Sequence, residues 1–287
     1  RDHLDFHTDV DDYFAAKASL FTPERARLAL LNIDDEHGRR LAGEVTIPVR
    51  TMSTTGRAAD WQASGIDRTT SGSRFVVRAP GGATFPGGCP LPGDFNVANA
   101  LAAIAACGEA GLDAAAVAAG MASGGGVPGR FELVDSGQDF VVMVDYAHKP
   151  DAVEAAIRTL RPLTRGHVIV VLGAGGDRDP GKRPMMGEIA ARLADVLIVT
   201  DDNPRTEDPA EIRAALLAGA AGGRAELVEV GDRRAAISEA VRRARTGDVV
   251  LVAGKGHETG QEIHGVVHPF DDRVVVREAL QEFGAGR

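Results

Sequence analysis

Apolar and polar positions follow a regular pattern over the second half of the chain. Five apolar runs rich in branched residues predict strands: Val141–Tyr146, Val168–Leu172, Val196–Thr200, Leu227–Val230 and Val249–Ala253. Segments with apolar residues at three-to-four spacing lie between them and predict helices: Asp151–Leu160, Pro184–Leu193, Pro209–Ala220 and Arg233–Arg245. Because strands that alternate with helices specify βαβ units, we expect an α/β domain with a mainly parallel sheet.

The first half of the chain is less regular. Its pattern predicts a helix over Tyr13–Phe21, a strand over Leu28–Ile33, a β-rich stretch over 44–90, an Ala-rich helix from Gly93 to about Cys107, and a second helix near 113–122. Ser123–Gly129 combines glycines with a proline and is the best linker in the sequence. We therefore expect two domains, covering residues 1–127 and 128–287.

Polar motifs follow four of the predicted strands in the second domain. They are Asp145–Pro150, Gly173–Pro184, Asp202–Arg205 and Gly254–Glu258. Each motif could be turn chemistry alone. However, parallel strands end at one edge of their sheet, and ligands of open α/β folds bind there. The four motifs therefore predict a single binding site.

The motif Asp202–Arg205 indicates the type of ligand. Asp202 and Arg205 carry opposite charges, and Asn203 offers both a donor and an acceptor. The group suits a small molecule with an ammonium and a carboxylate, such as an amino acid. A turn followed by a helix cap is the alternative interpretation.

Two glycine-rich segments match nucleotide-binding motifs only in part. Gly173–Gly176 lacks dinucleotide spacing, because Asp177 and Arg178 follow where a helix should open. Gly254–Gly256 resembles a piece of a phosphate loop but lacks the upstream Gly and the Ser or Thr that binds magnesium. We therefore expect no complete nucleoside triphosphate site from this sequence alone.

Composition narrows the class of protein. The length of 287 residues suits roughly two domains, and the net charge of −9 argues against a nucleic-acid partner. Two cysteines are too few for a disulfide framework. We find no signal-peptide pattern and no apolar run of about 18 residues, so we expect a cytoplasmic protein without membrane insertion. We also expect a monomer. Because the sequence opens at Arg1 inside a polar motif, we also expect a segment before it.

A longer series of motifs resembles the Mur ligases, in the order seen in that family. The motifs are Asp2–His7, Tyr13–Lys17, Gly93–Asn99, Gly129–Glu132, Asp145–His148, Gly176–Arg178, Asp202–Arg205 and Gly254–Glu258. The resemblance covers essentially the whole chain and is strongest for actinobacterial members that add meso-diaminopimelate. It implies part of the central ATPase domain followed by a C-terminal Rossmann-like domain. The family's N-terminal domain and phosphate loop are missing from this sequence.

The resemblance implies roles for individual residues. Lys17, as a carbamate, and His3 are implied ligands of Mg²⁺, which prefers oxygen ligands of the kind a carbamate supplies. Contacts to ATP are implied for Asn96, Arg130, Asp145 and His148, with Arg130 near the phosphates and Asp145 near the ribose. Contacts to meso-diaminopimelate are implied for Arg178, Asp202, Asn203, Arg205, Gly254 and Glu258.

The implied reaction is ATP-dependent amide bond formation. ATP would phosphorylate the γ-carboxylate of a UDP-N-acetylmuramoyl-L-alanyl-D-glutamate (UDP-MurNAc-dipeptide), and the amine of meso-diaminopimelate would attack the acyl phosphate. Arg178 and Arg205 would hold carboxylates and Glu258 the distal ammonium. Two alternatives stay open. One is a sibling amide ligase that uses L-lysine or a folate substrate. The other is a catalytically silent amino-acid-binding fragment, because the phosphate loop is absent.

Overall fold

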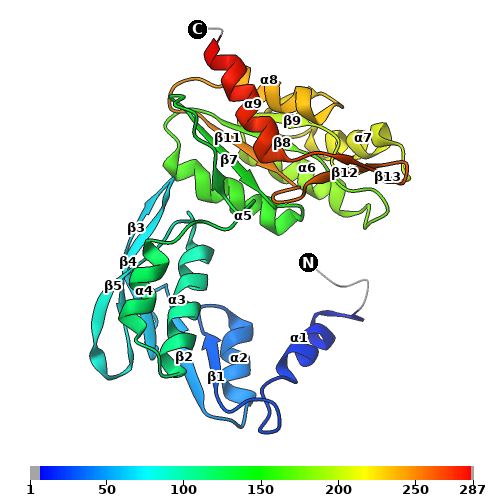
Figure 1. Ribbon diagram of the computed structural model, residues 1–287. Coiled ribbons are helices and arrows are strands. Elements are labelled where there is room, and N and C mark those ends of the chain that lie inside the picture. The colour runs from blue at the N-terminus through cyan, green and yellow to red at the C-terminus, as the bar shows by residue number, and fades with distance from the viewer. Residues whose placement is uncertain (1–6, 286–287) are drawn as a thin grey trace. The chain divides into compact units, whose positions relative to one another are not determined.

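The computed structural model describes residues 7–285, and the chain divides into two compact units, 1–125 and 126–287 (Figure 1). The second unit is built on a six-stranded sheet with the order β10-β9-β8-β11-β7-β6. These strands are β6 (Glu132–Leu133), β7 (Val141–Asp145), β8 (Val168–Leu172), β9 (Val196–Val199), β10 (Glu226–Glu229) and β11 (Val249–Ala253). All neighbours pair in parallel except β6, which is antiparallel to β7. The predicted α/β fold with a mainly parallel sheet is confirmed.

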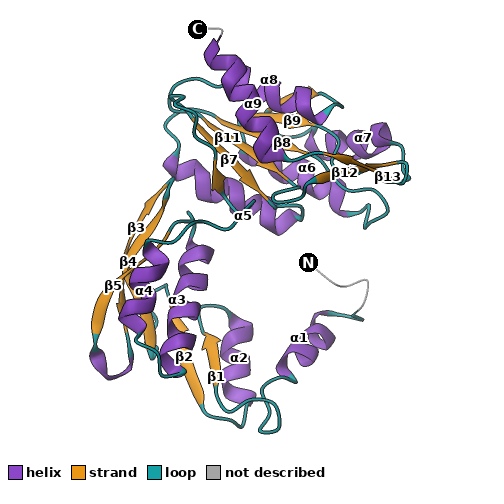
Figure 2. Cartoon of the chain, in the orientation of Figure 1, coloured by secondary structure: helices purple, strands orange, loops and turns teal. Residues whose placement is uncertain are grey.

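Helices cover both faces of this sheet (Figure 2). One face packs against α5 (Pro150–Leu160), α6 (Lys182–Leu193) and α7 (Pro209–Ala220), and the other against α8 (Arg233–Arg243) and α9 (Asp272–Ala285). The central strand β8 shows why its sequence is apolar throughout. Val168, Val170 and Leu172 enter one core, whereas Ile169 and Val171 enter the other. Each such side chain contributes about 1.5–3 kcal/mol on burial.

A short hairpin follows the last strand of the sheet. It consists of β12 (Gly260–Ile263) and β13 (Val266–Pro269), which pair antiparallel. The two residues between them, His264 and Gly265, have φ angles of 50° and 74°. Positive φ at both positions is what a tight type I′ hairpin turn requires. The sequence pattern alone did not predict this hairpin or α9.

The first unit contains a five-stranded mixed sheet in the order β1-β2-β3-β4-β5. Its strands are β1 (Ala29–Asn32), β2 (Val49–Ser53), β3 (Trp61–Thr69), β4 (Gly72–Arg78) and β5 (Thr84–Cys89). Its helices are α1 (Val10–Ala18), α2 (Glu36–Glu44), α3 (Asp94–Glu109) and α4 (Ala114–Ala122). Val97, Leu101 and Ile104 lie on one stripe of α3 and pack against the sheet around Trp61 and Phe75.

One predicted helix is shifted. The pattern placed it over Tyr13–Phe21, but α1 begins after Asp9, whose carboxylate accepts a 2.8 Å hydrogen bond from the backbone N–H of Asp12. This bond satisfies a donor of the first turn and fixes the start of the helix. The helix then ends at Ala18, and Phe21 lies in the following turns. Between residues 7 and 285, no helix has both the length and the apolar character that crossing a bilayer requires.

Candidate functional site

The loops that follow β7, β8, β9 and β11 meet at the carboxyl edge of the second unit's sheet. The backbone N–H of Gly176 donates to the carbonyl of Asn203 at 2.8 Å, and that of Gly254 donates to the carbonyl of Asp145 at 3.1 Å. These bonds join the loop after β8 to the loop after β9, and the loop after β11 to the end of β7. The four polar motifs therefore form one continuous edge.

Asn203, Lys255 and Glu258 form a hydrogen-bonded triad at this edge. The ammonium of Lys255 donates to Oδ1 of Asn203 at 2.9 Å and to Oε2 of Glu258 at 3.0 Å. Nδ2 of Asn203 donates to the same Oε2 at 2.9 Å. Burial raises the pKa of Glu258, but the bond from Asn203 and the charge of Lys255 more than offset this and hold the pKa below its usual range. Glu258 is therefore a carboxylate at neutral pH.

Arg205 occupies an unusual backbone position beside this triad. Its φ is 55°, in the left-handed region, and its backbone forms an isolated parallel bridge with Ile263 of the β12–β13 hairpin. Nη1 of its guanidinium donates to the carbonyl of Gly176 at 2.6 Å, and Nε lies 3.3 Å from Oε2 of Glu262. A guanidinium has five N–H donors, so three remain without a partner among the described residues. They are available to a planar acceptor such as a ligand carboxylate.

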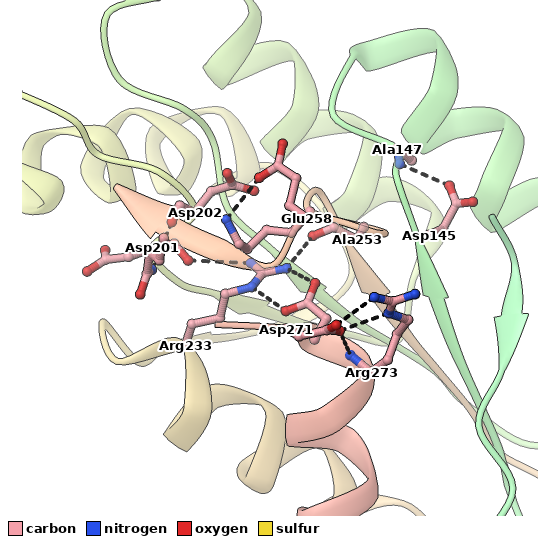
Figure 3. A network of polar contacts seen from close by, with 12 residues as sticks. Asp145, Ala147, Asp201, Asp202, Arg233, Ala253, Glu258, Asp271 and Arg273 are labelled. Atoms are coloured by element: carbon pink, nitrogen blue, oxygen red, sulfur yellow. Dashed lines mark hydrogen bonds and ion pairs between the residues drawn. The ribbon is translucent and has the colours of Figure 1, made fainter. Parts of the chain in front are cut away.

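Asp202 lies near a deeply buried ion pair. Gly254 has a φ of 119°, and a Cβ at this position would lie 2.4 Å from Oδ2 of Asp202 and 3.8 Å from Nη2 of Arg233. Arg233 is bound bidentately by Asp272, at 2.8 and 2.7 Å, with both side chains fully buried. Figure 3 shows the guanidinium of Arg233 between the segments that carry Asp201 and Ala253.

Arg233 connects the two segments through their backbones. Its guanidinium donates to the carbonyl of Ala253 at 2.9 Å and lies 3.4 Å from the carbonyl of Asp201. Burial disfavours the charged form, but Asp272 outweighs this effect and raises the pKa of Arg233. The positive charge therefore persists beneath the site.

Arg178 is exposed in the loop after β8. Its nearest polar partner is the carbonyl of the adjacent Asp177, at 3.4 Å from Nη1. The loop itself is anchored, because Arg183 binds Glu207 bidentately at 2.8 Å and Thr206 donates to the carboxylate of Asp177 at 2.8 Å. The guanidinium of Arg178 is therefore exposed to solvent, whereas the loop that carries it is anchored by these contacts.

A second group surrounds Tyr146, directly after β7. The guanidinium carbon of Arg130 lies 4.7 Å from the centroid of the Tyr146 ring, a cation–π distance. The rings of His148 and His257 lie 4.5 and 5.2 Å from the same ring. Nδ1 of His148 donates to the carbonyl of Tyr146 at 2.7 Å. Burial lowers the pKa of His148, so the neutral ring presents Nε2 as an acceptor.

Asp145 lies next to this second group, at the end of β7. Its carboxylate accepts backbone N–H bonds from Phe131 at 2.9 Å and Ala147 at 3.0 Å. Burial nevertheless outweighs these bonds and raises the pKa of Asp145. The carboxylate therefore fixes the ends of two backbone segments beside the Tyr146 ring.

The remaining predicted site residues lie in the first unit. Asn96 is buried in the first turn of α3, where its Nδ2 donates to the carbonyl of Pro92 at 2.7 Å. Lys17 is exposed on α1, with its Nζ 4.9 Å from the centroid of the Tyr13 ring. His3 lies outside the described residues. Within 7–285, no three His, Cys, Asp or Glu side chains converge as a metal site would require.

Two residues of the site were not predicted from the sequence. Lys255 belongs to the predicted motif Gly254–Glu258 but has no predicted role of its own, and Arg233 is predicted only as the start of a helix. The sequence signal for Lys255 is its place in a motif directly after an apolar strand, which marks the edge of the site but assigns no role to the side chain. Nothing in the sequence near Arg233 indicates its partner, since Asp272 is 39 residues away.

Comparison with known proteins gives consistent results. Residues 1–107 match the family described as "Mur ligase middle domain", and residues 129–256 match "Mur ligase, glutamate ligase domain". UDP-N-acetylmuramoyl-L-alanyl-D-glutamate–2,6-diaminopimelate ligase of Streptomyces coelicolor is 54% identical over 286 residues, which are 98% of this chain and 56% of that protein. The enzyme of the same name from Corynebacterium glutamicum is 50% identical, again over 98% of this chain and 56% of that protein.

Solved structures agree with the sequence relatives. A structure of a UDP-N-acetylmuramoyl-L-alanyl-D-glutamate–2,6-diaminopimelate ligase is 38% identical with a TM-score of 0.66, covering 99% of this chain and 59% of that one. Folylpolyglutamate synthase of Mycobacterium tuberculosis, at 21% identity and a TM-score of 0.67, covers 97% of this chain and 60% of that one. The second likeness concerns the fold alone. The chain thus spans a little over half the length of the curated relatives named above.

Proposed function

Because the chain belongs to the Mur ligase family, we propose that it supplies the amino-acid site and part of the ATP site of a meso-diaminopimelate-adding ligase. The reaction joins an amine of meso-diaminopimelate to the D-glutamyl γ-carboxylate of UDP-MurNAc-dipeptide, at the expense of ATP. The remaining part of the catalytic machinery, including a phosphate loop, is not encoded in these 287 residues.

The observation that carries the amino-acid assignment is the charge arrangement at the carboxyl edge of the sheet. Glu258 is a partly exposed carboxylate held by Asn203. The charge of Arg205 acts on Glu258, and three of its five guanidinium N–H donors remain available to a ligand after its contacts with Gly176 and Glu262. Arg178 adds a solvent-facing cation on the neighbouring loop. A ligand with a distal ammonium and a distal carboxylate complements this arrangement. L-lysine would leave one guanidinium unpaired, because it has no distal carboxylate.

The residues around Tyr146 support a contact to ATP. Arg130 would bind phosphate oxygens, as a guanidinium does with two parallel N–H groups. Asp145 lies at the end of β7, where a ribose would meet the sheet edge, and His148 offers a neutral ring acceptor. Asn96 of the first unit belongs to the same proposal on the family resemblance.

Mg²⁺ fits this chain only in part. A carbamate on the exposed Lys17 would give the ion an anionic oxygen ligand, and His3 would join it. When bound, the ion would neutralise charge on the transferring phosphoryl oxygens. The described residues contain no cluster of three His, Cys, Asp or Glu side chains that would complete such a site.

The test is steady-state kinetics on the full gene product with meso-diaminopimelate and with L-lysine. We expect a strong preference for meso-diaminopimelate. Arg205→Lys should raise its KM on the order of 10- to 100-fold, because a point-like ammonium cannot replace the planar fork that binds a carboxylate.

Arg224→Lys is the matched control. Arg224 is exposed and donates to the carbonyl of Leu193, at the opposite edge of the same sheet. This variant should leave both KM values unchanged. If Arg205→Lys also leaves the KM for meso-diaminopimelate unchanged, then Arg205 only ties loops together and the amino-acid assignment fails. A wild type that turns over L-lysine or a folate substrate instead would identify a sibling ligase.

A further inference from the structure

Lys255 is a fully buried cation within the site. The exposed fraction of its side chain is 0%, compared with 33% for Glu258. Two of its three N–H groups are bound by Asn203 and Glu258, at 2.9 and 3.0 Å. Because no part of the side chain reaches solvent, Lys255 cannot itself touch a ligand that binds at the surface of the site.

The backbone explains how a lysine reaches this position. It lies between Gly254 and Gly256, whose φ angles are 119° and 55°. A Cβ on Gly256 would lie 2.7 Å from both the carbonyl oxygen of Gly129 and Cβ of Tyr146. Both glycines are therefore required for the close approach of this loop to its neighbours, which turns the Lys255 side chain inward.

Lys255 determines how the amide of Asn203 is oriented. Oδ1 of Asn203 accepts from Lys255 and also from the backbone N–H of Glu262, at 3.0 Å. If the amide were rotated by 180°, its NH₂ group would face two donors. The Asn203 Nδ2 group must therefore point toward Glu258, as it does.

The same contacts determine which oxygen of Glu258 is available. Oε2 accepts from both Lys255 and Asn203, whereas Oε1 has no hydrogen bond within the described residues. Other charged groups also act on this carboxylate. They are Arg205, which is also paired with Glu262, and Arg233, which lies near both Asp202 and Glu258. Among Lys255, Arg205 and Arg233, Lys255 is the cation that is hydrogen-bonded to Glu258 in the part of the chain that the structure describes.

We propose that Lys255 is a positioning residue for the amino-acid site: it locks the amide of Asn203 and one oxygen of Glu258, so that the other oxygen faces the ligand ammonium. The identity of the ligand in this inference rests on the proposed function, whereas the contacts of Lys255 with Asn203 and Glu258 do not depend on that function. Lys255 acts through its two partners and makes no contact with substrate.

The first experiment measures the KM for meso-diaminopimelate against pH in the full gene product, with wild type and Lys255→Met. Loss of Lys255 should raise the pKa of Glu258. The KM ratio of variant to wild type should be on the order of 10- to 100-fold near pH 6 and fall several-fold by pH 9, where Glu258 is again ionised. The KM for ATP should stay unchanged.

A purely structural role predicts a different result. Damage to the fold would raise both KM values and lower kcat by a ratio independent of pH. Lys255→Met added to Glu258→Gln should have a much smaller effect than Lys255→Met alone, because residues that act as one unit are not additive. If the two effects are additive, or if the KM ratio does not vary with pH, the proposal is overturned.

A ligand-free measurement separates this inference from the proposed function. Carboxyl ¹³C NMR on the 287-residue chain, assigned with Glu258→Gln, should show a higher titration midpoint for Glu258 in Lys255→Met. Arg234→Met removes an exposed positive charge and should leave the midpoint unchanged. An unchanged midpoint in Lys255→Met refutes the inference even if the enzyme uses meso-diaminopimelate. Should Lys255→Met not fold, Lys255→Gln keeps a polar donor and serves for the same titration.

Discussion

The position of Gly254 depends on a backbone conformation that other residues rarely adopt. Its φ is 119°, and a Cβ there would lie 2.4 Å from the carboxylate of Asp202. The neighbouring Ala253 carbonyl is bound by Arg233, so the backbone cannot easily move away. Gly254 is therefore required by its φ angle and by the proximity of Asp202, and not by loop flexibility.

Gly254→Ala should destabilise the fold by about 1–3 kcal/mol, because a side chain is strained at this φ. It should also displace Asp202 and raise the KM for meso-diaminopimelate. Gly222→Ala is the control, since a Cβ on Gly222 would meet no atom within 4 Å and its φ is not positive. Urea unfolding and kinetics on both variants test this. Equal unfolding free energies for the two would show that the loop adapts to the methyl group.

Predictability differs sharply between residues of the same site. Asp202, Asn203 and Arg205 could be chosen because they follow a strongly apolar strand, and strand ends define ligand sites in such sheets. Lys255 could not be assigned a role, because its role depends on a fully buried environment that is created by Asn203, 52 positions away. The site roles themselves stay predictions until the variants are measured.

At the scale of elements, one ion pair connects four segments. Arg233 begins α8, Asp272 begins α9, and the carbonyls of Ala253 and Asp201 lie at or just after the ends of β11 and β9. Both charged side chains are fully buried. The ion pair therefore fixes the relation between the helices on one face of the sheet and the edge that carries the site.

Arg233→Met should lower the free energy of unfolding by about 3–5 kcal/mol, because it leaves Asp272 buried without its partner. The adjacent Arg234 is an internal control. It pairs with Glu278 at the surface, and Arg234→Met should cost no more than about 1 kcal/mol. Chemical denaturation of both variants provides the comparison. The double variant Arg233→Met/Asp272→Leu should recover much of the loss; if it does not, the hydrogen bonds to the strand-end carbonyls matter more than the charges.

Patterns of buried apolar residues predicted elements well, and patterns on exposed strands predicted them poorly. Val168–Leu172, Val249–Ala253 and Pro209–Ala220 agree with β8, β11 and α7 at both ends. The hairpin formed by Gly260–Ile263 and Val266–Pro269 was missed, although Ile263-His264-Gly265-Val266 holds the turn signal. Each of its strands has only four residues, and Val266 and Val267 are exposed, so no buried face gives a periodic pattern.

At the scale of the whole molecule, the two units are joined by a glycine-rich segment. Residues 122–128 are all exposed, and the contact pattern divides the chain within them, between Gly125 and Gly126. The second unit has two large cores of its own, one on each face of its sheet. These are the features of a unit that retains its fold after the connection is cut.

Limited proteolysis should therefore cleave first within residues 122–128 and release a fragment of about 160 residues that resists further digestion. Mass spectrometry locates the cut, and thermal unfolding of the purified fragment shows whether it still melts cooperatively. A second sample with Gly125→Pro and Gly126→Pro is the control, because these two residues lie outside α4 and stiffening them should slow this cleavage alone. Cleavage that begins inside the second unit would contradict its independence.

The bridge between Arg205 and Ile263 has a consequence for redesigning the proposed amino-acid site. The backbone N–H of Arg205 donates to the carbonyl of Glu262 at 3.0 Å, and its carbonyl accepts from His264 at 2.6 Å. Backbone hydrogen bonds on both sides of Arg205 thus attach it to the β12–β13 hairpin. Residues 202–205 and 260–269 therefore form one structural unit despite their separation in sequence. Transplanting a new ligand preference from a relative therefore means moving both segments together, because side chains such as Gln261 and Asn203 also bond from one segment to the other.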